Sequence, residues 1–460
     1  MDPARCLSDP EAFQRLQTLF RRLRAAGTEL APPRWRSLRE TFLARSAVPS
    51  EALARALGPD GVAPLLRLGL LEPAGQETLR ATIRISAHRE LLLLSDDDGA
   101  GRHARRDTVH TPEPASRMTA RQLPLGAGGR LLDVGCGGGF FTLIAASSGL
   151  SATGVDCNAR AVAMARLNAA LNGLHARFLR GSVDAPLALG ERFDLIVANL
   201  PFLASLLDVL PAHFGGPLGE NVVAPVLRRL RLRCAEGGSA HLPLLCYDGP
   251  RDQLGRLRRL VGRSFHLLLV HGPLGEADEM LEGFYGQMLL RSPVAPDAAR
   301  RARGQHLRYL RRRGVKRLGI GVLHALRTEA RPVVWRLTTP QLEALDAPFV
   351  RSLLALARKV GGEGVGELRR LPLEPVPGVE LHRIRGARPR WEIRLPEDDP
   401  RQPASIGEDV ARAVQAVLRG RRPLTHAGPA LLMQMVLRGW VWGAGWSVDW
   451  PGAARGRYAS

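Results

Sequence analysis

Lysine is almost absent from this chain, which has only Lys316 and Lys359 among its 65 basic residues. Arginine therefore carries nearly all of the positive charge behind the formal net charge of +21. Basic side chains that match phosphates release counterions, so this charge is compatible with a polyanionic partner. A GC-rich genome also biases codons towards arginine, so charge alone leaves nucleic-acid contact open.

Paired cysteines and long apolar runs are lacking as well. No cysteine stands in a C-x-x-C or Cys/His spacing, which argues against a structural metal and a disulfide framework. The chain starts with an early acid and without the apolar region of a signal peptide, and Arg438 interrupts its most apolar late stretch. We expect a cytoplasmic protein with no bound metal and no membrane span. The five cysteines are Cys6, Cys136, Cys157, Cys234 and Cys246.

The 460 residues allow two or three domains. Residues 1–100 read as helices followed by a strand pair, the order of a winged helix, which could bind nucleic acid or serve as a packing module. Residues 101–335 alternate strands with helices, which predicts an α/β fold with a doubly wound, mostly parallel sheet. We expect 264–272 and 282–292 to pair as its antiparallel edge. Residues 336–460 are expected to form a C-terminal accessory module of mixed α+β structure.

The strongest motif is the stretch LLDVGCGGGFF, in which an apolar strand ends at Asp133 and a helix begins near Phe140. Between them stand Gly135, Gly137 and Gly139, which let the backbone approach a nucleotide-like ligand closely. The dinucleotide fingerprint requires glycine at position 140. The spacing here is therefore G-x-G-x-G, which leaves a dehydrogenase-type or purely structural turn as the alternative readings.

A second acid, Asp156, ends the next strand and can accept both hydroxyls of a ribose. A glycine turn with two acids suits a cationic nucleotide better than a pyrophosphate, and points to S-adenosylmethionine. Here the chain resembles the class I S-adenosylmethionine-dependent methyltransferases, specifically the methyltransferase small-domain and release-factor glutamine methyltransferase group.

That resemblance implies a seven-stranded Rossmann-like sheet and a set of cofactor-binding residues. Asp133 and the glycines would hold the methionine end, and Asp156 the ribose. Asp184, in a segment where relatives often read Gly-Asp, would reach the adenine. The complete cofactor-binding set is Asp133, Gly135, Cys136, Gly137, Gly139, Asp156, Cys157, Ser182 and Asp184.

The stretch VANLPF follows the fourth strand and places Asn199, Leu200, Pro201 and Phe202 at its end. It resembles the [DN]-P-P-[FY] motif of methyltransferases acting on nitrogen, with Leu200 in place of the first proline. A planar amino group is a poor nucleophile because its lone pair is delocalised. Hydrogen bonds to the Asn199 side-chain oxygen and the Leu200 carbonyl would orient it, with Phe202 stacking and Pro201 fixing the turn. Alternatively, Asn199 caps the strand and Phe202 belongs to the core.

Two further segments carry weaker signals. The proline-containing stretch 107–116 resembles a loop that closes over the cofactor in the same group, or it is a stiff linker. The basic run 300–317 could follow a phosphate backbone, with Tyr309 available to stack. Its leucines, Leu307 and Leu310, indicate one buried face and one solvated arginine face, the commoner situation for a charge run.

We therefore predict a cytoplasmic S-adenosylmethionine-dependent N-methyltransferase that modifies a planar amino or amide nitrogen, first of all on ribosomal RNA. Alternative acceptors are a glutamine in a translation factor and a small metabolite. A non-enzyme alternative is a nucleic-acid-binding regulator whose methyltransferase fold senses the cofactor. The intact Asn199–Phe202 motif argues against this regulator, because a sensor has no use for it.

Overall fold

The computed structural model describes most of the first 363 residues and short segments beyond them. The described residues are 1–26, 36–44, 46–58, 60–96, 107–126, 128–182, 187–207, 214–250, 252–291, 294–339, 342–363, 373–375, 380–384, 390–394, 404–406, 414–415 and 441–443.

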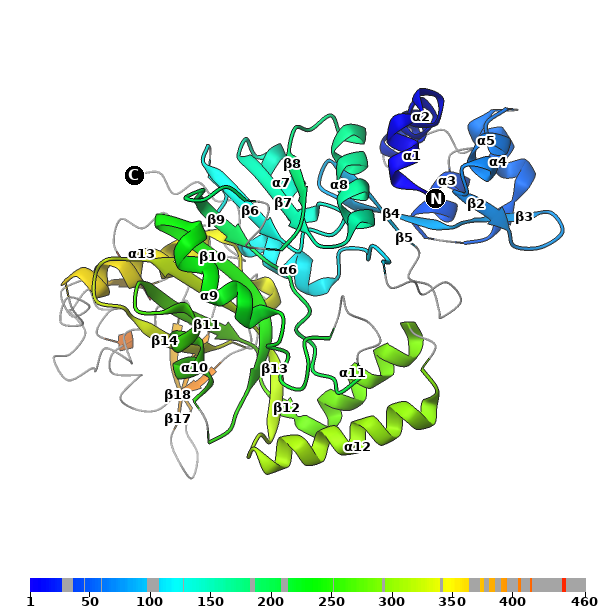
Figure 1. The fold of residues 1–460 in the computed structure, drawn as a ribbon. Helices are drawn as coiled ribbons and strands as arrows, with labels where there is room; N and C mark the ends of the chain where they lie inside the picture. The colour runs from blue at the N-terminus through cyan, green and yellow to red at the C-terminus, as the bar shows by residue number, and fades with distance from the viewer. Residues whose placement is uncertain are drawn as a thin grey trace.

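A mostly parallel sheet forms the centre of the molecule (Figure 1). Its strands run in the order β8-β7-β6-β9-β10-β13-β11, β14 extends it beyond β11, and β12 pairs with β13. Strand β13 is antiparallel to both of its neighbours in that order. The predicted α/β class and Rossmann-like sheet are confirmed, with β12 and β14 added to the expected seven strands. The strands are β6 (Arg130–Val134), β7 (Ser151–Asp156), β8 (Arg177–Arg180), β9 (Phe193–Val197), β10 (Cys234–Tyr247), β11 (Phe265–His271), β12 (Gly275–Glu276), β13 (Arg317–Arg327) and β14 (Val334–Thr338).

Strand β6 lies at the centre of the parallel part of this sheet. Its Leu132 pairs with Thr153 of β7 on one side and with Ile196 of β9 on the other. Because the carboxyl ends of parallel strands meet at one edge, the segments that follow β6, β7 and β9 lie next to one another there. The glycine turn, Asp156 and the Asn199–Phe202 motif therefore share one edge of the sheet.

Helices cover both faces of the sheet. Neighbouring residues of β6 point to opposite faces: Leu131 packs with the α7 side chains, and Leu132 packs with those of α9. The first face carries α6 (Pro114–Gln122), α7 (Phe140–Ser147), α8 (Ala159–Leu171) and α13 (Ala347–Glu363), and the second carries α9 (Val223–Arg233) and α10 (Gln253–Val261).

The predicted antiparallel edge at 264–292 is half wrong. Residues 265–271 do form β11, but 282–292 fall largely in helix α11 (Ala277–Arg291), which forms a hairpin with α12 (Pro296–Arg312). Its buried residues Leu281, Phe284, Tyr285 and Met288 follow helical spacing. The antiparallel strand is instead β13, which begins at the last residue of the basic run 300–317.

The N-terminal residues form a small helical unit with a three-stranded sheet in the order β1-β3-β2, and its assignment as a winged helix stays a prediction. Figure 1 shows this unit beside α8, which α1 contacts directly. The elements are α1 (Pro3–Ser8), α2 (Pro10–Ala26), α3 (Arg36–Phe42), β1 (Val48–Pro49), α4 (Ser50–Leu57), α5 (Val62–Arg67), β2 (Leu71–Pro73) and β3 (Thr78–Ala81).

A hairpin, β4 (Ile83–His88) and β5 (Leu91–Asp96), joins this unit to the main sheet. Asn168 of α8 accepts a hydrogen bond from the Leu94 backbone N–H (2.8 Å) and donates one to its carbonyl (3.0 Å). The hairpin packs on both sides, with the N-terminal helices through residues such as Ile85 and Leu94 and with the α7–α8 layer through Leu91 and Leu93. The three predicted domain ranges themselves stay predictions.

The first residues after 335 still belong to the main sheet and its helical layer. Strand β14 pairs with β11, and α13 packs on the sheet through Phe349, Val350 and Leu353. Most of the predicted C-terminal module lies outside the described residues. Its described strands are β15 (Leu373–Pro375), β16 (Glu380–Ile384), β17 (Arg390–Arg394), β18 (Ala404–Ile406) and β19 (Val441–Gly443). None of the described helices is both long and apolar enough to span a membrane.

Candidate active site

The glycine turn between β6 and α7 leaves space for a ligand. Gly135, Gly137 and Gly139 have φ angles of 71°, 52° and 89°, in the left-handed region that other residues rarely adopt. A Cβ atom placed on Gly137 would have no neighbour within 4 Å. The turn thus presents bare backbone to open space at the carboxyl edge of the sheet.

Asp156 supports this turn from the end of β7. Its Oδ2 accepts a hydrogen bond from the Gly137 N–H, and its Oδ1 accepts one from the Asn158 N–H, both at 2.8 Å. Burial raises the pKa of Asp156, and these two hydrogen bonds oppose that rise. Each carboxylate oxygen keeps a further lone pair, so the side chain can still accept two hydroxyl groups of a ribose.

Asp133 lies fully buried behind the turn. Its Oδ2 accepts hydrogen bonds from the Thr142 N–H (3.0 Å) and hydroxyl (2.7 Å), which fixes the first turns of α7. Its Oδ1 is buried with no hydrogen-bond partner among the described residues, and burial raises the pKa of Asp133 to about 7. An unpartnered buried carboxylate oxygen suits a hydrogen-bond donor on a cationic ligand.

The remaining predicted cofactor residues differ in placement. The Cys136 thiol is buried and turned towards β7, because a Cβ on Gly154 would come within 2.9 Å of its Sγ. Cys157 and Ser182 are both exposed, the first directly after β7 and the second shortly after β8. Asp184 lies outside the described residues, so the prediction for the adenine end stays a prediction.

Asn199, at the end of β9, is held by a side chain from a distant segment. Its Nδ2 donates a hydrogen bond of 2.7 Å to the Ser116 hydroxyl in the first turn of α6. This bond engages the amide nitrogen and leaves the Oδ1 atom as the acceptor. The side chain thus offers the oxygen that an incoming N–H group requires.

The rest of the motif connects the glycine turn to the core. The Leu200 Cδ2 atom would lie only 2.9 Å from a Cβ on Gly135, so Leu200 packs directly on the turn. The Pro201 and Phe202 carbonyls lie against Gly215 and Gly219, where a Cβ would collide with them. Phe202 is 6% exposed and packs in the main core, so its stacking role stays a prediction.

The segment 107–116 crosses this edge of the sheet. At one end the Asn158 Nδ2 donates to the Asp107 carbonyl (2.9 Å), and at the other Ser116 contacts Asn199. Between them, Val109 Cγ1 would lie 3.5 Å from a Cβ on Gly138. The segment thus runs over the glycine turn from the end of β7 to the end of β9, the location expected of a loop that closes over a cofactor.

Ser116 and Asn168 were not identified from the sequence. Besides holding β5, Asn168 donates a hydrogen bond of 2.9 Å to the Gly138 carbonyl and so steadies the glycine turn. The sequence did contain a signal for Asn168, because a lone amide on an apolar helix face implies a buried hydrogen-bond partner. Ser116 carried no such signal, since its partner is 83 residues away.

Together, the doubly wound sheet, the glycine turn and the acid after β7 define a nucleotide-cofactor domain of the α/β class. Residues 109–210 match the family model of the methyltransferase small domain. This match confirms the predicted resemblance to the methyltransferase small-domain group.

Two curated relatives illustrate the similarity. The chain is 39% identical over 102 residues to the ribosomal protein L11 methyltransferase of Thermus thermophilus, which covers 22% of this chain and 37% of the relative. It is 31% identical over 139 residues to ribosomal RNA small subunit methyltransferase C of Alcanivorax borkumensis, covering 29% and 39%. The chain thus spans less than half the length of these relatives.

Among solved structures, the chain is similar to the T. thermophilus 16S rRNA N2 G1207 methyltransferase in complex with AdoMet and guanosine. The sequence identity is 18% and the TM-score 0.30, and the similarity covers 60% of this chain and 61% of that protein.

Proposed function

We propose that this chain is an S-adenosylmethionine-dependent N-methyltransferase whose acceptor is a planar amino nitrogen on RNA. The observation that carries the proposal is the Asn199 amide. Its nitrogen is engaged by Ser116, its Oδ1 remains an acceptor, and the neighbouring Leu200 touches the glycine turn. An acceptor N–H bound to this oxygen is therefore held beside the donor site.

The residues at the carboxyl edge fit this cofactor. The open space at Gly137, the two remaining acceptor positions of Asp156 and the unpartnered Oδ1 of Asp133 correspond to a bulky, ribose-bearing and cationic ligand. When bound, S-adenosylmethionine supplies a methyl group on a sulfonium leaving group. The contribution of the chain is then mainly to orient the acceptor lone pair and to hold it close.

Net charge and the relative named for ribosomal RNA support RNA as the acceptor. A second candidate is a protein acceptor, including a glutamine amide in a translation factor, because a relative is named for ribosomal protein L11. Both acceptors present a planar or readily oriented nitrogen.

All five cysteines carry free thiols, which supports a reducing compartment such as the cytoplasm.

The acceptor is tested by transfer of a tritiated methyl group from S-adenosylmethionine. The purified chain is incubated with separated RNA, protein and metabolite fractions from a strain that lacks the gene. We expect label in RNA with the native chain and none with Asn199→Ala. Label confined to protein would overturn the RNA acceptor. Label in no fraction, from protein that binds the cofactor, would overturn the enzymatic activity.

A further inference from the structure

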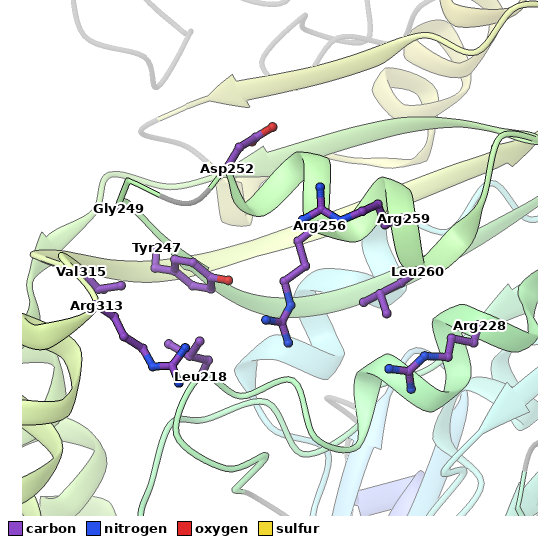
Figure 2. Close-up of a pocket in the computed structure, with 10 residues that line it drawn as sticks. All are labelled: Leu218, Arg228, Tyr247, Gly249, Asp252, Arg256, Arg259, Leu260, Arg313 and Val315. Atoms are coloured by element: carbon purple, nitrogen blue, oxygen red, sulfur yellow. The ribbon is translucent and has the colours of Figure 1, made fainter.

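A basic pocket lies at the carboxyl end of β10, outside the residues assigned to the donor and the acceptor motif. Its volume is about 570 Å³. Figure 2 shows Arg256 extending from α10 towards Tyr247 and Leu218, with Arg313 and Arg228 on opposite sides. The lining residues are Leu218, Arg228, Tyr247, Gly249, Asp252, Arg256, Arg259, Leu260, Arg313 and Val315.

The pocket shares a wall with the acceptor motif. Residues 214–220 pack on one side against the Pro201 and Phe202 carbonyls, and on the other supply Leu218 to the pocket. At the end of this segment, Glu220 accepts a hydrogen bond of 3.0 Å from the Tyr247 hydroxyl. A polymer bound in the pocket would therefore lie next to the Asn199–Phe202 motif.

The α11–α12 hairpin holds this wall in position. Tyr285 of α11 accepts a hydrogen bond from the Leu206 N–H (3.1 Å), and His306 of α12 donates one to the Pro217 carbonyl (2.8 Å). Burial lowers the pKa of His306, which favours its neutral form. The hairpin thus links the basic run of α12 to the acceptor side of the sheet.

Positive charge in the pocket is only partly balanced. Arg256 pairs with Glu220 at 2.6 Å, and the Asp252 carboxylate caps α10 through the Leu254 and Gly255 N–H groups. The side chains of Arg228 and Arg259 are exposed and make no hydrogen bond or ion pair within the described part of the chain. Unpaired guanidinium groups at the lining of a hollow attract an anion.

The arginines of α12 also differ in whether an acidic side chain balances their charge. Arg300 pairs with Asp297, and Arg303 pairs with Asp278 (3.3 Å) and Glu282 (3.1 Å), at the start and middle of the helix. At its end, Arg311–Arg313 and Tyr309 line a second hollow that adjoins the pocket through Arg313. The Arg313 guanidinium lies 4.6 Å from the centre of the Tyr309 ring.

We propose that these two adjoining hollows bind successive phosphates of a single-stranded RNA acceptor. Guanidinium groups match phosphate oxygens with two parallel hydrogen bonds, and a row of them at two neighbouring positions fits a polymer of phosphates. The Tyr309 ring holds the Arg313 guanidinium in place beside these groups. This inference rests on the proposed RNA acceptor. In it, the pocket holds the RNA backbone while the target base reaches Asn199.

The test compares two neighbouring arginines of α10 in the full chain. Arg259→Glu changes a side chain of the pocket, whereas Arg258→Glu makes the same charge change on an exposed residue outside it. Affinity for a fluorescent single-stranded RNA oligonucleotide is measured by anisotropy at several salt concentrations. We expect Arg259→Glu to weaken RNA binding about tenfold and to lower the salt slope by about one unit, with little change for Arg258→Glu.

Equal weakening by both variants would overturn the proposal, because it would reflect net charge alone. Stronger competition by a polyglutamate peptide than by RNA would overturn it in favour of an acidic protein partner. Calorimetry of S-adenosylmethionine binding and the methyl-transfer assay test the proposed function separately from RNA binding. If the chain binds RNA through Arg259 but transfers no methyl group, the proposal for the pocket stands and the proposed enzymatic function fails.

Discussion

The donor side and the acceptor side of the sheet are built in different ways. The donor side takes the glycine turn, Asp133 and Asp156 from one stretch of chain, around β6, β7 and the helices that follow them. The acceptor side combines α6, the end of β9, the 214–220 segment and the α11–α12 hairpin. In the proposed function, a local unit would therefore hold the donor, while distant segments would shape the acceptor site.

Charge separates the two sides as well. On the donor side, backbone N–H groups already bind both oxygens of Asp156. On the acceptor side, Arg228 and Arg259 face a hollow without a carboxylate partner within the described residues. The donor side is thus organised before its proposed ligand arrives, whereas the proposed RNA would balance the charge of the acceptor side.

Removal of the Asp156 carboxylate is expected to have the largest effect on the donor side. Asp156→Ala removes the proposed ribose contacts and the Gly137 support, so affinity for S-adenosylmethionine falls by about 100-fold or more, since hydrogen bonds to charged groups contribute about 1.5–3 kcal/mol each. RNA affinity should stay the same. Calorimetry with the cofactor and anisotropy with RNA measure the two effects, and a parallel loss of both would break the comparison.

The pH dependence of cofactor binding sharpens the role of Asp133. Burial raises its pKa from about 3.8 to about 7, so its contribution to folding stability is full below about pH 4 and is lost as the pH rises through 7. A cationic ligand beside Oδ1 favours the ionised form. Affinity for S-adenosylmethionine should therefore rise between pH 6 and 7.5, by at most about tenfold per pH unit.

Asp133→Asn is the matched control for this titration. It keeps an oxygen for the Thr142 hydrogen bonds and removes the ionisation. Calorimetry across the same pH range should give a flatter profile. If the native chain and this variant had the same pH profile, Asp133 would not take part in cofactor binding.

The smallest effect is expected on the acceptor side at Ser116. Ser116→Ala removes the hydroxyl that holds the Asn199 amide, and a neutral hydrogen bond is worth about 1 kcal/mol, so kcat should fall about fivefold. The KM for S-adenosylmethionine should not change. Ser116→Thr, which retains a hydroxyl, should restore part of the rate. A changed cofactor KM with an unchanged kcat would assign Ser116 to the donor side instead.

The donor side could be predicted from sequence patterns because its elements are contiguous in the chain. The strand before Asp133, the glycines and the strand before Asp156 are each visible within a few residues, and the sheet places them together. The position of the Asn199 motif at the same edge followed from strand order. Its contact with Ser116 did not, because no local pattern joins residues 83 positions apart.

The acceptor side shows why the remaining fold was harder to predict. The aromatic pair Phe284-Tyr285 favours a strand and the flanking Gly283 and Gly286 disfavour a helix, although the buried residues of this segment have helical spacing. Strand β13 begins within the charged run and contains Gly319 and Gly321, residues that weaken a strand signal. In both places tertiary packing decided the structure against local composition.

Asn199→Ala and Asp156→Ala, measured side by side, test the division between donor and acceptor most directly. Each variant is assayed for S-adenosylmethionine affinity by calorimetry and for single-turnover methyl transfer to the identified acceptor at saturating cofactor. Asn199→Ala should bind the cofactor normally and lose transfer by about 100-fold, the scale of a misplaced acceptor. Asp156→Ala should bind weakly and recover most of its transfer at saturation. Loss of cofactor affinity in Asn199→Ala, or full transfer by that variant, would contradict the account.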